Sequence, residues 1–300
     1  NLNNTADTLG VISVISDTIK DNRNTTNSTT ASQSVKIVVD VVFSNTSIFT
    51  GSSEASSTVV TVMDKLTEEP SLISTNSGEK IVSILSAILS DKTIVLSNRT
   101  LSEVTNTARH VESVMLTSTS STTKRAFNTL ISNLMDLNRK QTEAGSKVQI
   151  RLNNLVSEVV KEIATSTTVL KSVVTDTKLN AQLTTNVNSA IIQKVNGTVS
   201  LEIISYSFSI FDNTSLSSSI VRVKVFVNDE EFSSDSRRSL TDDQLFETTL
   251  PVEPKTSSNS TYTCRYWDDV EQKWQNDTSV CSYVYDELNN LLSCSCVQSV

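Results

Sequence analysis

The spacing of apolar residues changes once along this chain of 300 residues, at Gly197. Before that glycine, apolar side chains recur every three or four residues, which places them on one face of a helix. An amphipathic helix buries that face against neighbours, so the pattern predicts a packed helical bundle. The apolar stripes run over residues 35–42, 59–66, 81–89, 101–115, 127–134, 148–163 and 179–191. The Val-rich stretch 35–43 also fits a buried strand.

After Gly197 the apolar residues alternate with polar ones. Val199, Leu201 and Ile203 follow this period of two, and residues 221–227 repeat it with charged residues on the other face. Alternation with β-branched residues predicts half-buried antiparallel strands. The chain is therefore expected to be an α+β protein, with a helical part at residues 1–196 followed by a β part at residues 197–300.

The scarcity of glycine and proline supports long helices in the first part. The chain has only 5 Gly and 3 Pro, and neither occurs in residues 79–144 or 146–196. A capping box at Thr100–Leu–Ser–Glu103 predicts a helix start at that point. The scattered glycines form no phosphate-binding loop, which argues against nucleotide chemistry.

Charge and histidine content exclude further classes of function. The formal net charge is −8 and the basic residues are dispersed, so nucleic acid is not an expected partner. His110 is the only histidine and is expected to be exposed to solvent, and a multi-histidine metal site is excluded. Acidic runs at 229–231 and 242–243 are expected to be solvated loops, because they do not have the spacing of a calcium-binding loop. No metal, cofactor or membrane-spanning segment is expected within these residues.

All four cysteines lie near the C-terminus, at Cys264, Cys281, Cys294 and Cys296. An even number within one short segment is typical of a local disulfide framework in an oxidising compartment. The alternative is a four-thiolate zinc site, but such sites usually contain two C-x-x-C hooks and this segment has a single C-x-C. The cysteines therefore favour disulfides.

N-glycosylation triplets agree with a secreted protein but do not establish one. Several would occur by chance in a chain so rich in Asn, Ser and Thr. The acceptors are Asn3, Asn24, Asn27, Asn45, Asn98, Asn196, Asn213, Asn259 and Asn276.

Two tryptophans lie among the cysteines. Cys264–Arg–Tyr266–Trp267–Asp is followed by Trp274, Cys281 and the C-x-C pair. This pattern resembles the GPS motif that ends the GAIN domain of adhesion G-protein-coupled receptors and of polycystin and REJ-type membrane proteins. The resemblance implies a GPS motif at 264–300 within a β-sandwich subdomain at 197–300, preceded by a helical subdomain at 1–196. It also implies bridges Cys264–Cys294 and Cys281–Cys296, with Tyr266, Trp267 and Trp274 in the core.

The sequence departs from the family at the point of self-cleavage. There the family has His-Leu-[Ser/Thr], in which the histidine acts as a base and the hydroxyl attacks the preceding carbonyl. This chain has Gln298, Ser299 and Val300. Gln298 cannot accept a proton near neutral pH, and Val300 has no hydroxyl. Autoproteolysis is therefore not expected, and the resemblance implies a domain that keeps the fold without the reaction.

These features lead to a functional hypothesis. The chain is expected to be an extracellular, non-enzymatic module of a larger cell-surface protein that acts in adhesion or mechanical coupling. The expected partners are other extracellular or cell-surface proteins, N-glycans, and the membrane through a segment outside this chain. The alternatives are a structural glycoprotein of an extracellular coat or filament, an active autoprotease and a cytosolic helical scaffold.

Overall fold

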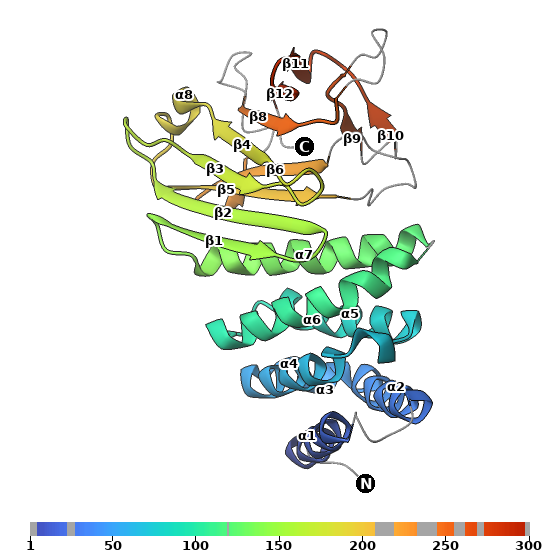
Figure 1. The fold of residues 1–300 in the computed structure, drawn as a ribbon. Coiled ribbons are helices and arrows are strands. Elements are labelled where there is room, and N and C mark those ends of the chain that lie inside the picture. The colour runs from blue at the N-terminus through green and yellow to red at the C-terminus, as the bar shows by residue number, and fades with distance from the viewer. Residues whose placement is uncertain are drawn as a thin grey trace. The chain divides into compact units, whose positions relative to one another are not determined.

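The computed structural model describes residues 5–22, 28–118, 120–207, 219–232, 245–254, 262–268 and 273–297. Within them the chain forms two compact units, the first extending to Leu137 and the second beginning at Asn138. Helices make up the described part of the first unit, and antiparallel strands dominate the second (Figure 1). The prediction of an α+β fold with helices first is confirmed.

The helical unit is built from seven α-helices and a 3₁₀ turn in the described residues. They are α1 (Thr5–Asp21), α2 (Ser28–Ser44), α3 (Thr46–Phe49), α4 (Ser53–Thr67), η1 (Pro70–Leu72), α5 (Thr75–Ser90), α6 (Asn98–Thr117) and α7 (Ser121–Gln141). The last four residues of α7 belong to the second unit. Residues 35–42 lie in α2, so the helical reading of this Val-rich stretch is confirmed and the strand alternative is wrong.

Serine side chains mark where three of these helices begin. The hydroxyls of Ser52, Ser74 and Ser97 accept hydrogen bonds from backbone N–H groups at the starts of α4, α5 and α6. Each bond satisfies a donor that has no partner within its helix. The predicted start at Thr100 is therefore wrong by three residues, because Ser97 rather than Thr100 is the cap and α6 begins at Asn98.

The predicted apolar stripes form the core of the helical unit. Helix α4 lies against α1 and α6, and α5 lies against α2 and α6. Helix α1 was not predicted, because its apolar residues are split between two faces. Leu9 and Ile12 are buried, whereas Val11, Val14 and Ile15 are exposed.

The described residues of the second unit form two five-stranded sheets and a small hairpin, all antiparallel. The first sheet has the order β1-β2-β5-β6-β7 and the second has the order β11-β12-β8-β4-β3. The strands of the first are β1 (Ser146–Arg151), β2 (Leu155–Ile163), β5 (Thr198–Tyr206), β6 (Ile220–Val227) and β7 (Glu230–Glu231). Those of the second are β3 (Lys171–Thr175), β4 (Gln182–Val187), β8 (Phe246–Pro251), β11 (Cys281–Asp286) and β12 (Leu291–Cys296).

Alternate residues of the two sheets pack together as one hydrophobic core. Val156, Leu201 and Val223 of the first sheet belong to the same buried cluster as Leu183 and Leu292 of the second. This is the arrangement of a β-sandwich, in which the inner faces of two sheets meet. The hairpin consists of β9 (Tyr266–Asp268) and β10 (Lys273–Gln275), and one short helix, α8 (Ser189–Ile192), precedes β5.

Two predicted helices are strands in the structure. Residues 148–163 form most of β1 and β2, and residues 179–191 include β4. The first seven residues of β2 are all buried, so both of its faces are covered and the alternation of a half-buried strand is missing. In β4, Thr185 takes an interior place between Leu183 and Val187, which weakens the period of two. The last long helix therefore ends at Gln141, and strands begin at Ser146. The change from helices to strands lies about 50 residues before the predicted position at residue 197.

Candidate functional site

The candidate site is the C-terminal disulfide module, which is built around β12. This strand lies between β11 and β8 and is hydrogen-bonded to both. Cys294 and Cys296 are two residues apart, so both side chains project from the same face of the strand. That face belongs to the core, with Leu292 and Cys296 buried and Cys294 packed against them. The C-x-C spacing therefore delivers two sulfur atoms to the interior of the sandwich.

Each of these cysteines forms a disulfide with a different segment. Cys281 of β11 lies directly opposite Cys296 in the strand register and is bonded to it, with their Cα atoms 4.2 Å apart. Cys264 lies before β9 and is bonded to Cys294, with a Cα separation of 5.9 Å. These are the two pairs that the resemblance implies. No cysteine is free, so the zinc alternative is wrong.

Two aspartate turns hold β11 in place. At the start of the strand, Asp277 accepts hydrogen bonds from the backbone N–H and the hydroxyl of Ser279 at 2.9 and 2.7 Å. At its end, the Asp286 carboxylate accepts from the Asn289 side chain at 2.7 Å and from two backbone N–H groups. These hydrogen bonds stabilise the charged carboxylates and lower the pKa of both. The turns thus set the register that brings Cys281 opposite Cys296.

The aromatic residues of the motif lie mainly in the small hairpin. Trp267 pairs with Trp274 across β9 and β10, but the Trp267 side chain lies outside the described residues. Tyr266 and Trp274 are half-buried, and the burial implied for them is not seen. The core is instead lined by Tyr262 and Tyr285, whose rings lie 5.0 Å apart. Burial, reinforced by the neighbouring Tyr262, raises the pKa of the Tyr285 phenol.

The degenerate cleavage tripeptide, Gln298, Ser299 and Val300, lies outside the described residues. The last described residue is Val297, whose N–H donates to the Val280 carbonyl at 3.0 Å. Pairing between the ends of β11 and β12 therefore extends one position beyond Cys296. The absence of autoproteolysis stays a prediction.

The glycosylation acceptors differ in exposure. Asn98, Asn196 and Asn276 are exposed, whereas Asn45 is half-buried and its side-chain amide donates to the Val41 carbonyl at 2.7 Å. A glycan can be accommodated only where the asparagine side chain reaches solvent, so the first three remain predicted acceptors. The rest lie outside the described residues, namely Asn3, Asn24, Asn27, Asn213 and Asn259.

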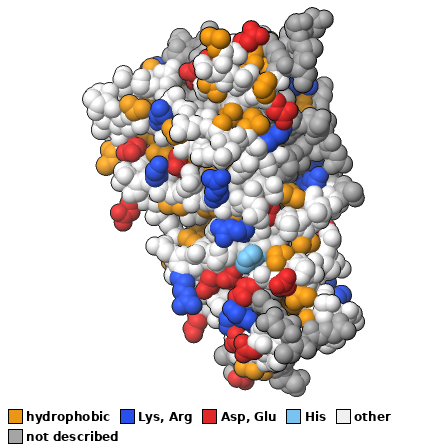
Figure 2. All heavy atoms as spheres, viewed as in Figure 1, with side chains coloured by type: hydrophobic (Ala, Val, Ile, Leu, Met, Phe, Trp, Pro, Cys, Tyr) orange, Lys and Arg blue, Asp and Glu red, His pale blue; other side chains and the backbone are white. Residues whose placement is uncertain are grey.

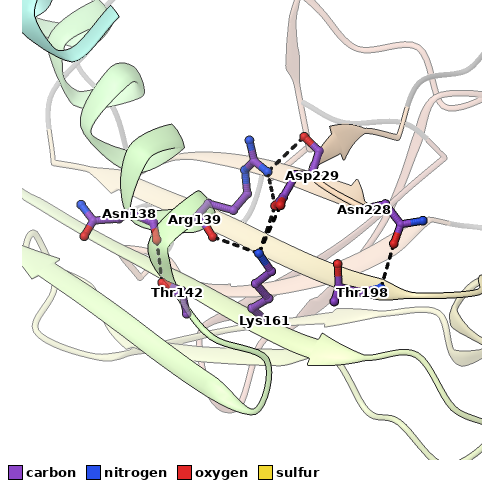
Figure 3. A network of polar contacts seen from close by, with 7 residues as sticks. All are labelled: Asn138, Arg139, Thr142, Lys161, Thr198, Asn228 and Asp229. Atoms are coloured by element: carbon purple, nitrogen blue, oxygen red, sulfur yellow. Dashed lines mark hydrogen bonds and ion pairs between the residues drawn. The ribbon is translucent and has the colours of Figure 1, made fainter. Parts of the chain in front are cut away.

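An ion network with two buried cations in the second unit was not predicted from the sequence. Arg139, at the end of α7, donates to the Asp229 carboxylate at 2.7 Å, and Lys161 of β2 lies 3.2 Å from the same oxygen (Figure 3). The Arg139 guanidinium also stacks over the Phe226 ring, 3.9 Å from its centroid. Asp229 was expected in a solvated acidic loop, and that expectation is wrong because two buried cations hold its carboxylate.

The sequence feature that could have predicted this network is the Asn228–Asp229 pair, which forms the turn between β6 and β7. Asn228 and Asp229 both adopt positive φ, of 50° and 66°, and join Val227 to Glu230 in a two-residue hairpin. Such a turn favours Asn and Asp at its two central positions. The alternation of residues 221–227 followed by Asn-Asp carried this information.

The only histidine is not fully exposed, contrary to the prediction. His110 on α6 is half-buried, and its Nδ1 lies 3.3 Å from the Thr67 hydroxyl of α4. Acidic side chains lie on the surface around it (Figure 2). Among the residues that the structure describes, no group of three metal-ligating side chains is found, and no helix is long and apolar enough to cross a lipid bilayer.

Comparison with known proteins supports the fold. A solved structure of the full extracellular region of zebrafish Gpr126 (Adgrg6) matches with a TM-score of 0.56 and 16% sequence identity. The match covers 83% of this chain and 34% of the zebrafish chain. The sequence matches no protein-family profile, and no curated protein is similar to it. At this identity the likeness concerns the fold alone, which is GAIN-like.

Proposed function

We propose that this chain is an extracellular, non-enzymatic module of a larger cell-surface protein, of the adhesion-receptor or polycystin and REJ type, which acts in adhesion or mechanical coupling. The observation that carries the proposal is that both disulfides of the C-terminal module end on β12, within a helix-then-sandwich fold that resembles an extracellular region. Disulfides persist in oxidising compartments, which supports a place outside the cell. Other extracellular or cell-surface proteins are the proposed partners.

The position of β12 favours the transmission of force. The chain leaves the described residues directly after this strand. Tension on the following residues would load β12, which is hydrogen-bonded to strands on both sides and covalently linked at Cys294 and Cys296. The bridges join β12 covalently to β11 and to the segment before β9, so neither can separate from β12 while the bridges are intact. This is the property that a mechanical coupling module requires.

Mechanical coupling also requires that the polypeptide stay continuous. Gln298 and Val300 replace the base and the nucleophile of the cleavage reaction, so the bond between Ser299 and Val300 is proposed to remain intact. The test is a denaturing gel of the protein, produced in secreting cells with its native downstream residues and a tag at each end. A single full-length band is expected.

A matched control restores the expected tripeptide with Gln298→His, Ser299→Leu and Val300→Thr in the same protein. Appearance of two fragments in this variant alone would show that the site keeps the required geometry and lacks only the reacting groups. Fragments divided after Ser299 in the unaltered protein would overturn the non-enzymatic assignment.

Location is tested separately on the same cells. Surface labelling of the intact protein, with Cys264–Cys294 and Cys281–Cys296 recovered in a non-reducing peptide map, is the expected result. Free thiols at all four positions in freshly lysed cells would place the chain in a reducing compartment and contradict the proposal.

A further inference from the structure

The segment just before β5 contains the sequence Asn196–Gly197, the only Asn-Gly pair in the chain. Asn196 is exposed, and its side chain is therefore in contact with water. Gly197 has a φ of 117°, and a Cβ atom at this position would collide with the Asn228 side chain. The structure thus requires glycine here, and glycine is the residue that leaves its own backbone nitrogen most accessible to a preceding asparagine side chain.

The Asn228 side chain is hydrogen-bonded to the peptide groups on both sides of Gly197. Its amide nitrogen donates to the Asn196 carbonyl at 3.1 Å, and its amide oxygen accepts from the Thr198 N–H at 2.9 Å. The second of these bonds is drawn in Figure 3. In the part of the chain that the structure describes, nothing accepts a hydrogen bond from the Gly197 N–H. This nitrogen therefore has no acceptor to give up before it reacts.

We propose that Asn196 is a modification site at which the folded chain deamidates spontaneously through a cyclic imide. The Gly197 N–H loses its proton to solvent, and the nitrogen attacks Cγ of Asn196. The N–Cγ bond forms, the Cγ–Nδ2 bond breaks and ammonia leaves with the proton that it needs. Water then opens the five-membered imide at either carbonyl, which yields aspartate or isoaspartate.

Asn228 is a positioning residue for this reaction. Loss of the Gly197 proton places negative charge on the peptide group that Gly197 shares with the Asn196 carbonyl. The hydrogen bond from Asn228 falls on that carbonyl oxygen, where the charge develops. A donor already aimed at a developing oxyanion stabilises the transition state more than the ground state.

The product would disturb the sandwich at a defined place. The Gly197 carbonyl accepts from the Ala164 N–H at 2.8 Å, and Thr198 is the first residue of β5. Isoaspartate adds a methylene group to the backbone at residue 196. This addition lengthens the chain just before Gly197 and shifts the Gly197 carbonyl and Thr198 relative to their hydrogen-bond partners. A glycan on Asn196 would occupy the same nitrogen and block the reaction.

The experiment uses the full chain with Thr198→Val, secreted from cells, so that residue 196 cannot be glycosylated. The folded protein is held at 37 °C at neutral and mildly alkaline pH, and peptide maps are recorded over days. We expect a progressive loss of Asn196 to aspartate and isoaspartate, faster at the higher pH, while Asn76 and Asn289 convert more slowly. These two are exposed and begin no glycosylation triplet, but they precede the larger residues Ser77 and Asn290. If Thr198→Val does not fold, the unaltered chain made with glycosylation inhibited replaces it.

The matched variant is Asn228→Asp, which keeps the acceptor for Thr198 and removes the donor to Asn196. Its Asn196 is expected to convert at least about fivefold more slowly, because the variant loses one hydrogen bond from the transition state and places a carboxylate beside the oxygen on which negative charge develops. An equal or faster rate would overturn the role of Asn228. Survival of Asn196 in the folded chain, while the heat-unfolded chain converts, would overturn the site itself.

Discussion

Asp64 on α4 is a carboxyl group whose surroundings in the folded chain disfavour its charged form. It is half-buried. Glu103 of α6 and Glu68, which directly follows α4, repel its charge, whereas Lys20 of α1 attracts it. Burial first, and the two glutamates second, raise the pKa of Asp64 from 3.8 to about 6. The pKa of Asp64 is higher in the folded chain than in the unfolded chain. The contribution of Asp64 to the free energy of unfolding is therefore fully present below about pH 4 and is lost as the pH rises through about 6.

Asp64→Asn should therefore stabilise the helical unit at pH 7, by about 1 kcal/mol after allowance for solvent screening of a half-exposed group. The gain should vanish near pH 4, where Asp64 is already neutral. Urea unfolding followed by helical circular dichroism at the two pH values measures both effects. A gain of the same size at pH 4 would show that charge is not its cause.

Asp229 is the single carboxylate described between two buried cations. Arg139 is 1% exposed and Lys161 is 7% exposed. Asp229→Asn keeps the shape and tolerates the positive φ but removes the negative charge that pairs with Arg139 and Lys161. We expect a loss of about 2 kcal/mol from the stability of the second unit. Removing one cation as well, with Lys161→Met, should recover part of that loss.

The control for this prediction is Glu231→Gln in the neighbouring strand β7. Glu231 pairs with Lys224 at 2.6 Å, but the Lys224 side chain is 32% exposed, whereas both cations around Asp229 are buried. An exposed pair contributes little, so less than about 0.5 kcal/mol should be lost. Equal losses for Asp229→Asn and Glu231→Gln, measured by the same chemical unfolding, would contradict the importance assigned to burial.

At the scale of elements, the two disulfides link different kinds of segment to β12. Cys281–Cys296 joins neighbouring strands already paired by hydrogen bonds, with a sequence separation of 15. Cys264–Cys294 has a separation of 30 and links a segment without regular structure to β12. Loss of either, by paired Cys→Ala changes, should cost about 3 to 4 kcal/mol, because each closes a loop in the unfolded chain.

Limited proteolysis distinguishes their local effects. Without Cys264–Cys294, cleavage should appear between Val252 and β9 while the two sheets stay protected, because this bridge is the covalent link between Cys264 and β12. Without Cys281–Cys296, β11 should remain paired with β12 through the ladder. Cleavage within β11 in the first variant would contradict this assignment.

At the scale of the whole molecule, the bridges limit how far the chain can extend under load. A force applied at the two ends of the full protein passes from Cys264 through the disulfide to Cys294, so the 30 intervening positions cannot extend. In single-molecule pulling, a reductant should lengthen the fully extended chain by about 100 Å. An unchanged length would mean that the bridges do not carry the load.

Much of this fold could be predicted from local sequence, but buried strands were mistaken for helices. Residues 35–42, 59–66 and 101–115 lie in helices as their spacing indicated. Residues 148–163 were assigned to a helix because β2 is buried on both faces, and a strand of that kind carries no period of two. The cysteines were recognisable as a disulfide module from their number and clustering, and the pairing was implied by the family resemblance alone.

The sequence by itself determined the helices with one apolar face, the order of helices before strands, and the C-terminal disulfide module. These features depend on residues that are near one another in the chain. Only the tertiary structure decided where the sandwich begins and that Arg139 and Lys161 share Asp229. The start of the sandwich depends on which surfaces cover β2. The ion network depends on contacts between residues that lie 90 and 68 positions apart in the chain, and the local spacing of apolar residues does not indicate such contacts.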